Sequence, residues 1–65
     1  MIQELINQLN SGEATVEFTK LSGDRRTMVC TWGERGKVDG NVVRVFDVES
    51  NEYRSIRPES ILEVR

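Results

Sequence analysis

The stretch VVRVFDVESNEYRSIRPESILEV, which covers Val42–Val64, decides the fold of this chain because it contains a hairpin followed by one more short strand. Its polar run Glu49–Glu52 is of the kind that closes a four-residue turn between antiparallel strands. The cross-strand partners expected from this turn are Val48 with Tyr53, Asp47 with Arg54, Phe46 with Ser55, Val45 with Ile56, and Arg44 with Arg57.

Side chains alternate between the two faces of a strand, so this hairpin has one apolar face and one mixed face. The apolar face carries Val43, Val45 and Ile56 and is expected to join the core. The mixed face combines apolar side chains with two arginines: Phe46, Val48, Tyr53, Arg44 and Arg57.

The expected pairing sets two like charges, Arg44 and Arg57, side by side. Such a pair costs energy unless a carboxylate or a bound anion lies between the two guanidinium groups. A neighbouring acid such as Glu17 or Glu63 would be a purely structural solution, whereas a bound anion would make this face a binding site. A one-residue slip in the register would remove the conflict.

Upstream of the hairpin, apolar residues first follow a helical spacing and then alternate. The helical set is Ile2, Leu5, Ile6 and Leu9, which predicts a short amphipathic helix that must pack on the rest of the domain or on a partner. Gly12 is suited to end this helix. Alternation from Ala14 to Phe18 predicts the first strand.

A second strand is predicted over Arg26–Trp32, which is rich in residues that favour strands. Its core face carries Met28, Cys30 and Trp32. The following segment, Gly33–Asn41, has three glycines and no apolar period, so we expect a mobile loop of the kind that often binds ligands.

Pro58 cannot donate a hydrogen bond within a sheet, so a tight turn at Pro58–Ser60 should precede a final strand at Ile61–Val64. The chain is then one domain, 1–65, with a helix in 1–11 and five short strands in 14–65. Short strands joined by tight turns favour closure of the sheet. The predicted fold class is therefore mainly β: a short N-terminal α-helix followed by a five-stranded SH3-like or Sm-like small barrel.

The amino-acid composition excludes several kinds of site. The 65 residues carry 9 basic and 11 acidic side chains, one cysteine and no histidine. Cys30 cannot form an internal disulfide, and an ordinary zinc or iron site lacks ligands, so we expect no metal, no cofactor and a cytoplasmic setting. No apolar run is long enough for a membrane span. Because so short a chain has a small core, we also expect a homo-oligomer.

The sequence FDVESNEYRSIRPESI, Phe46–Ile61, places an aromatic residue and Asp before a polar turn, and an aromatic residue, Arg, Ser, an apolar residue and Arg after it. This pattern resembles the C-terminal strand pair of WYL domains, and the chain looks most similar to the small, stand-alone, Sm-like WYL-type proteins that are found mostly in bacteriophages. The resemblance implies a ligand-sensing or nucleic-acid-binding barrel of viral origin in the host-cell cytoplasm. Carried over by position, its motif points to Tyr53, Arg54, Ser55 and Arg57.

We therefore expect a phosphate-bearing ligand, either RNA, single-stranded DNA or a small nucleotide, because an arginine beside an aromatic ring can hold a phosphate and its base. The predicted ligand-binding residues are Arg44, Tyr53, Arg54 and Arg57. A basic rim is predicted from Arg25, Arg26, Arg35 and Lys37.

Catalysis is not expected, because the chain has no histidine and no glycine-rich phosphate loop. Cys30 lies on a predicted core face, where a thiol is inert. The alternative to an anion-binding module is a viral protein-interaction module that docks on a host protein through a strand edge or the helix. The net charge of -2 favours that alternative, because avid binding to nucleic acid usually needs a basic excess.

Overall fold

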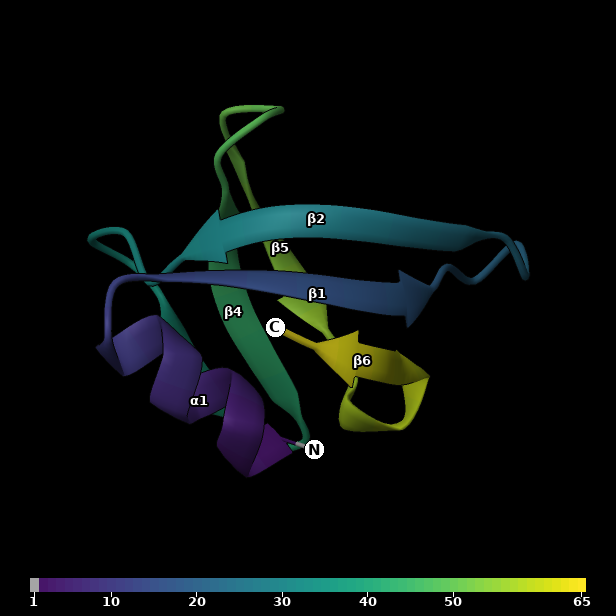
Figure 1. Cartoon of the computed structure of the whole chain (residues 1–65), viewed down its shortest axis with the longest axis horizontal. Coiled ribbons are helices and arrows are strands. Elements are labelled where there is room, and N and C mark those ends of the chain that lie inside the picture. The colour runs from purple at the N-terminus through teal and green to yellow at the C-terminus, as the bar shows by residue number, and fades with distance from the viewer. Residues whose placement is uncertain (1) are drawn as a thin grey trace.

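The computed structural model describes residues 2–65, which form one helix and a curled antiparallel sheet of six strands (Figure 1). In chain order the elements are α1 (Ile2–Asn10), β1 (Glu13–Thr19), β2 (Arg25–Thr31), β3 (Lys37–Asp39), β4 (Val42–Asp47), β5 (Glu52–Ile56), the 3₁₀ turn η1 (Pro58–Ser60) and β6 (Ile61–Val64). The predicted mainly β fold with an N-terminal helix is confirmed; Met1, which the prediction put in the helix, lies outside the described residues.

The strands follow the order β3-β4-β2-β1-β6, with β5 on the other side of β4. The β1–β2 hairpin crosses over β4 and β5 at a steep angle, and β6 lies beside β1 (Figure 1). Each of β5 and β6 pairs with a single described strand, β4 and β1 respectively. The sheet is thus curled into a small, partly open barrel, and the turn at Pro58 separates its last two strands as expected.

The core fills the inside of the curl and is closed by the helix. Its buried side chains are Leu5, Leu9, Ala14, Val16, Met28, Cys30, Val43, Val45, Ile56 and Ile61. The apolar stripe of α1 therefore packs on the domain itself, and burial of each leucine contributes about 2 kcal/mol. The Trp32 indole N–H also donates to the Asn10 side chain at 2.9 Å, which ties the end of α1 to the sheet.

The segment predicted as a mobile loop contains the short strand β3, which pairs with β4. Thr31 in β2 lies opposite Phe46, and Lys37 in β3 lies opposite Arg44, so the chain runs along the same side of β4 before and after Trp32–Gly36. Residues 32–36 are thus an irregular insertion between β2 and β3, which pair with the same side of β4. The prediction of five strands therefore misses one, because β3 is short, exposed and without apolar alternation.

The register of the β4–β5 hairpin differs from the prediction by two residues. Phe46 pairs with Tyr53, and Arg44 pairs with Ser55. The predicted pairing of Arg44 with Arg57 is therefore wrong. A two-residue shift preserves the two faces of the hairpin, because side chains alternate with a period of two. For that reason the predicted core residues of this hairpin are nevertheless buried.

The shift arises because Asp47 organises the turn. Its carboxylate accepts hydrogen bonds from the backbone N–H groups of Glu49 at 3.1 Å and Ser50 at 3.3 Å. Its carbonyl accepts the N–H of Asn51 at 2.8 Å, and Asn51 adopts a left-handed φ of 58° that asparagine tolerates well. The turn is therefore Val48–Asn51, one residue earlier than the polar run suggests.

Asp47 is also completely buried, with two arginines around its carboxylate. The Oδ2 atom lies 2.6 Å from the Arg26 guanidinium and 2.9 Å from Nε of Arg54. Burial alone would raise the pKa of Asp47, but hydrogen bonds from Arg54 and Ser50 and the charge of Arg26 lower that pKa to about 2. One carboxylate thus joins β2, β4, β5 and their turn.

Replacing Asp47 with Asn should lower the free energy of unfolding by about 2–3 kcal/mol, because it removes the buried partner of two half-buried arginines and leaves Arg26 without a carboxylate. Urea denaturation at neutral pH measures this loss. The control is Glu52→Gln, which removes an exposed partner of Arg54 and should cost less than about 0.5 kcal/mol. Equal losses in the two variants would show that the buried carboxylate has no special role.

The pH dependence of stability follows from the lowered pKa of Asp47. Its charged form contributes fully above pH 3.8, and the contribution is lost as the pH falls toward 2, for a total of about 2 kcal/mol. Urea denaturation between pH 5 and pH 2 should show this decline in the natural chain. The Asp47→Asn variant should have a correspondingly flatter profile over the same interval, and parallel profiles would contradict the assignment.

Candidate basic face

The mixed face of the β4–β5 hairpin is centred on Tyr53. Phe46 and Tyr53 form an edge-to-face aromatic pair, with ring centroids 5.1 Å apart and an interplanar angle of 66°. The guanidinium carbon of Arg44 lies 5.2 Å from the centroid of the Tyr53 ring, within the range of a cation–π contact. Two of the predicted ligand-binding residues, Arg44 and Tyr53, are thus brought together.

The segment between β2 and β3 brings a third residue, Arg35, next to Tyr53. The backbone N–H of Arg35 donates to the Tyr53 hydroxyl at 2.9 Å. This approach requires Gly33, whose φ is 62° and where a Cβ would lie 2.5 Å from the Tyr53 oxygen. Gly36 is equally restricted, because a Cβ there would overlap the carbonyl group of Trp32. Gly33 therefore permits close packing on Tyr53, and Gly36 permits close approach to the Trp32 carbonyl.

Three cations line an open hollow of about 370 Å³ on this side of the sheet: Arg35, Lys37 and Arg44. Lys37 lies directly opposite Arg44 in the β3–β4 register. Among residues 2–65, no carboxylate oxygen comes within 4 Å of the charged nitrogens of these three side chains. We call Arg35, Lys37, Arg44 and Tyr53 the basic face.

The sequence predicts that Arg44 lies opposite another positively charged side chain, and the structure shows such a pair, but with a different residue. Arg44 faces Lys37 rather than Arg57, and neither Glu17 nor Glu63 neutralises it. Glu17 lies opposite Glu63 in the β1–β6 pairing, and Glu63 forms an ion pair with Arg65. Sequence analysis missed the Lys37–Arg44 pair because it did not detect β3, although both residues had been selected as candidates.

The other predicted site residues lie elsewhere. Arg54 and Arg26 surround Asp47, and Arg54 also pairs with Glu52 at 2.8 Å. Arg57 follows β5 and has one exposed acidic neighbour, Glu59, at 3.8 Å. Arg25 is exposed at the start of β2 and lines none of the hollows described for residues 2–65.

The single cysteine of the chain, Cys30, lies in the core. Burial, helped by the charges of Asp47 and Glu13, raises the pKa of the Cys30 thiol to about 11, so this side chain stays protonated at neutral pH. Within 2–65 no group of three histidine, cysteine or acidic side chains is arranged to hold a metal ion. Over the same residues, no helix has the length and hydropathy needed to cross a bilayer.

Gly33→Ala tests whether close packing on Tyr53 shapes the basic face. The matched control is Gly40→Ala, because Gly40 has nearly the same φ, 60°, and no atom near the added methyl group. Both variants incur backbone strain, but only Gly33→Ala also forces Tyr53 to move, so it should be less stable by about 1–3 kcal/mol. Thermal denaturation measures the difference, and amide chemical shifts of Arg35 should change only in the Gly33 variant. Equal stability would show that Tyr53 yields freely.

Comparison with known proteins gives one match. A family model described as WYL_2, with an Sm-like SH3 beta-barrel fold, matches residues 2–62. No curated protein and no solved structure shows a significant match. The matched range includes α1 and every strand as far as the middle of β6, and it confirms the resemblance that Phe46–Ile61 indicated.

Proposed function

Because this chain belongs to the WYL_2 family of Sm-like SH3 barrels, we propose that it is a non-enzymatic module that binds a phosphate-bearing ligand on the basic face. The ligand class is single-stranded RNA or DNA, or a small nucleotide that presents the same phosphate and base. Barrels of this type are usually binding modules, and their activity depends on what a particular surface can hold.

The observation that carries this proposal is the distribution of charge. Of the nine lysines and arginines, four are paired with carboxylates among the described residues: Arg26, Arg54, Arg57 and Arg65. Three of the remaining five line one hollow. An anion placed between Lys37 and Arg44 would relieve their repulsion, which is a direct energetic reason for a phosphate to bind there.

Tyr53 adds a reason to expect a base. An aromatic ring beside cations is the combination found in single-strand sites, where base stacking supplies about 1–3 kcal/mol per base. The Tyr53 ring is held by Phe46 on its edge and by the Arg35 N–H at its hydroxyl, so it is fixed before a ligand arrives. Arg44 over the ring would bind phosphate or extend the stack, because guanidinium planes also stack on bases. We assign Arg54 and Arg26 a structural role.

The test is fluorescence anisotropy with labelled eight-nucleotide rU and dT strands, and with unlabelled ATP as a competitor. The double variant Lys37→Gln/Arg44→Gln should weaken binding at least about tenfold. Its matched control, Arg25→Gln/Arg65→Gln, removes the same charge away from the face and should change affinity less than about twofold by long-range effects. Similar losses in both would indicate nonspecific attraction and contradict the assigned face.

Salt dependence gives an independent readout. If three cations contact phosphates, the logarithm of affinity should fall with the logarithm of salt concentration with a slope near -2, and the double variant should flatten it. Tyr53→Leu should weaken binding without changing that slope, because stacking releases no counterions. An unchanged slope in the double variant would refute the phosphate contacts, and effective competition by ATP would identify a nucleotide rather than a strand.

A second candidate function is a protein-interaction module that docks on a host protein. The observation that favours it is the outer edge of β5, with which no other strand in residues 2–65 pairs and to which another strand could add. A bacteriophage origin, the host cytoplasm as location and assembly into a homo-oligomer stay predictions. Assembly would bring several basic faces together and raise the apparent affinity for a strand.

A further inference from the structure

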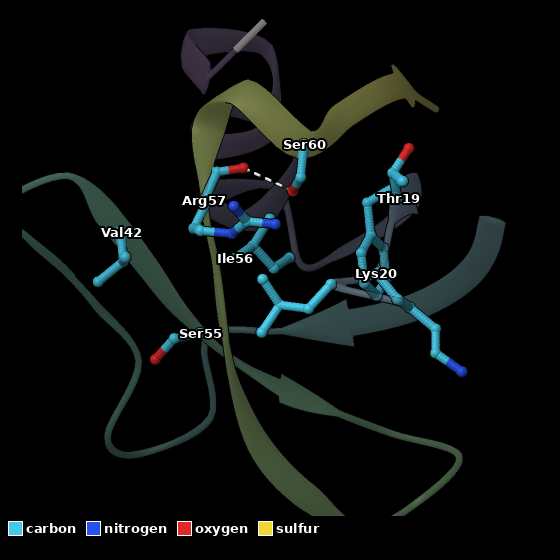
Figure 2. Close-up of a pocket in the computed structure, with 9 residues that line it drawn as sticks. Thr19, Lys20, Val42, Ser55, Ile56, Arg57 and Ser60 are labelled. Atoms are coloured by element: carbon cyan, nitrogen blue, oxygen red, sulfur yellow. Dashed lines mark hydrogen bonds between the residues drawn. The ribbon is translucent and has the colours of Figure 1, made fainter. Parts of the chain in front are cut away.

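A second concave surface lies beside β5, on the side away from β3. Two adjoining hollows of about 290 Å³ each share five lining residues: Phe18, Lys20, Leu21, Ser55 and Ile56. Figure 2 shows Ile56 and Arg57 on one side of the opening and Thr19 and Lys20 on the other, with the Arg57 guanidinium above Ile56 and the Lys20 amine directed outward. We call this surface the β5 groove.

The backbone along this groove has unused hydrogen-bonding capacity. β5 pairs with β4, and no other described strand pairs with it. In an antiparallel strand, alternate residues direct their N–H and C=O groups toward the opposite edge, so the outer edge of β5 offers a template for another strand. η1 turns the chain away after Arg57, and β6 pairs with β1 instead.

The groove contains an apolar patch formed by Phe18, Leu21 and Ile56, which line both hollows. Leu21 is 88% exposed, the largest exposure among the large hydrophobic residues of the described chain. It lies next to the half-buried ring of Phe18 and the buried Ile56. Pockets for alternate side chains beside a free edge are the two features that strand addition uses for specificity and affinity.

The charge of the residues lining the groove favours a negatively charged ligand. None of the residues that line the two hollows is acidic. Lys20 has no carboxylate within 4 Å among residues 2–65, and Arg57 has only the exposed contact to Glu59 at 3.8 Å. In a chain with net charge -2, this acid-free stretch is complementary to negative charge.

We propose that the β5 groove binds an extended acidic segment of a partner protein, which adds as a strand to the outer edge of β5. β5 has five residues, so the segment is about five residues long, or roughly 16 Å. Alternate apolar side chains of the segment contact Leu21 and Phe18, and its carboxylates meet Lys20 and Arg57. This site is separate from the basic face.

The experiment is a titration of the full ¹⁵N-labelled chain with the peptide acetyl-VEVEV-amide, followed by amide chemical shifts. Shifts should concentrate at Phe18–Leu21 and Ser55–Arg57, and hydrogen exchange along β5 should slow as its edge is paired. The peptide acetyl-VKVKV-amide has the same strand propensity and the opposite charge. It should bind at least about tenfold more weakly.

Two variants locate the site. Leu21→Asp and Arg57→Glu should each weaken the acidic peptide at least about tenfold. The matched control for the first is Leu62→Asp, because Leu62 is an exposed leucine, 40% accessible, outside the groove. The control for the second is Arg25→Glu. Oligonucleotide affinity should be unchanged by Leu21→Asp, which separates this site from the basic face.

Each contrary outcome overturns the proposal. The absence of chemical-shift changes at about 1 mM peptide would refute it, because strand addition should give a complex with a Kd well below that concentration. So would equal binding of the lysine peptide, or shifts confined to other elements. Concentration-dependent shifts of β5 without peptide would assign the edge to a second copy of the chain. Shifts of the groove with the rU strand would assign its cations to phosphate instead.

Discussion

The buried carboxylate of Asp47 is the constraint on which the rest of the structure depends. Burying a charge in so small a core is costly unless it is paired and hydrogen-bonded, and here two guanidinium groups and two backbone N–H groups surround it. These contacts come from β2, β5 and the turn. Moving either arginine or the turn would remove part of this compensation, so the carboxylate favours the observed turn and strand register.

That register determines where the surface charges lie. With Phe46 opposite Tyr53 and Arg44 opposite Ser55, the Arg44 side chain reaches the Tyr53 ring. A hairpin with its turn one residue later, at Glu49–Glu52, would shift the pairing by two residues and place Arg44 beside Arg57 instead. The interaction that stabilises the core thus also occupies Arg26 and Arg54, whereas Arg44 has no acidic partner among residues 2–65.

Sequence reasoning recovered the features that depend on periodicity. The helical stripe of Leu5 and Leu9 and the alternation around Val16 and Val43 identify buried residues correctly, because burial follows the face of an element. The register of the hairpin could not be read in the same way. It depends on whether Asp47 acts as a strand residue or also as the cap of the turn, and both fit the same alternation.

The glycine-rich segment illustrates the second limit. Gly33 and Gly36 resemble the composition of a flexible loop, yet in the folded chain they permit close approach to Tyr53 and to the Trp32 carbonyl. Composition alone does not distinguish a glycine needed for backbone flexibility from one needed because a Cβ would collide with a neighbouring group. β3 was missed for a related reason: a three-residue exposed strand buries nothing and has no apolar signal.

The distribution of free cations explains how an acidic chain can present two different attractive surfaces. Net charge governs long-range attraction, but binding at contact distance depends on which charges are already neutralised. Here the exposed acids Glu52, Glu59 and Glu63 lie beside Arg54, Arg57 and Arg65 respectively, none of which belongs to the basic face. Among residues 2–65, the cations without an acidic partner include Arg35, Lys37 and Arg44 at the basic face and Lys20 at the β5 groove, where Arg57 has only its 3.8 Å contact with Glu59. Because both surfaces depend on the same strand, pairing of the β5 edge would also stiffen the strand that carries Tyr53, and occupancy of one surface would then favour the other by lowering the entropy still to be lost.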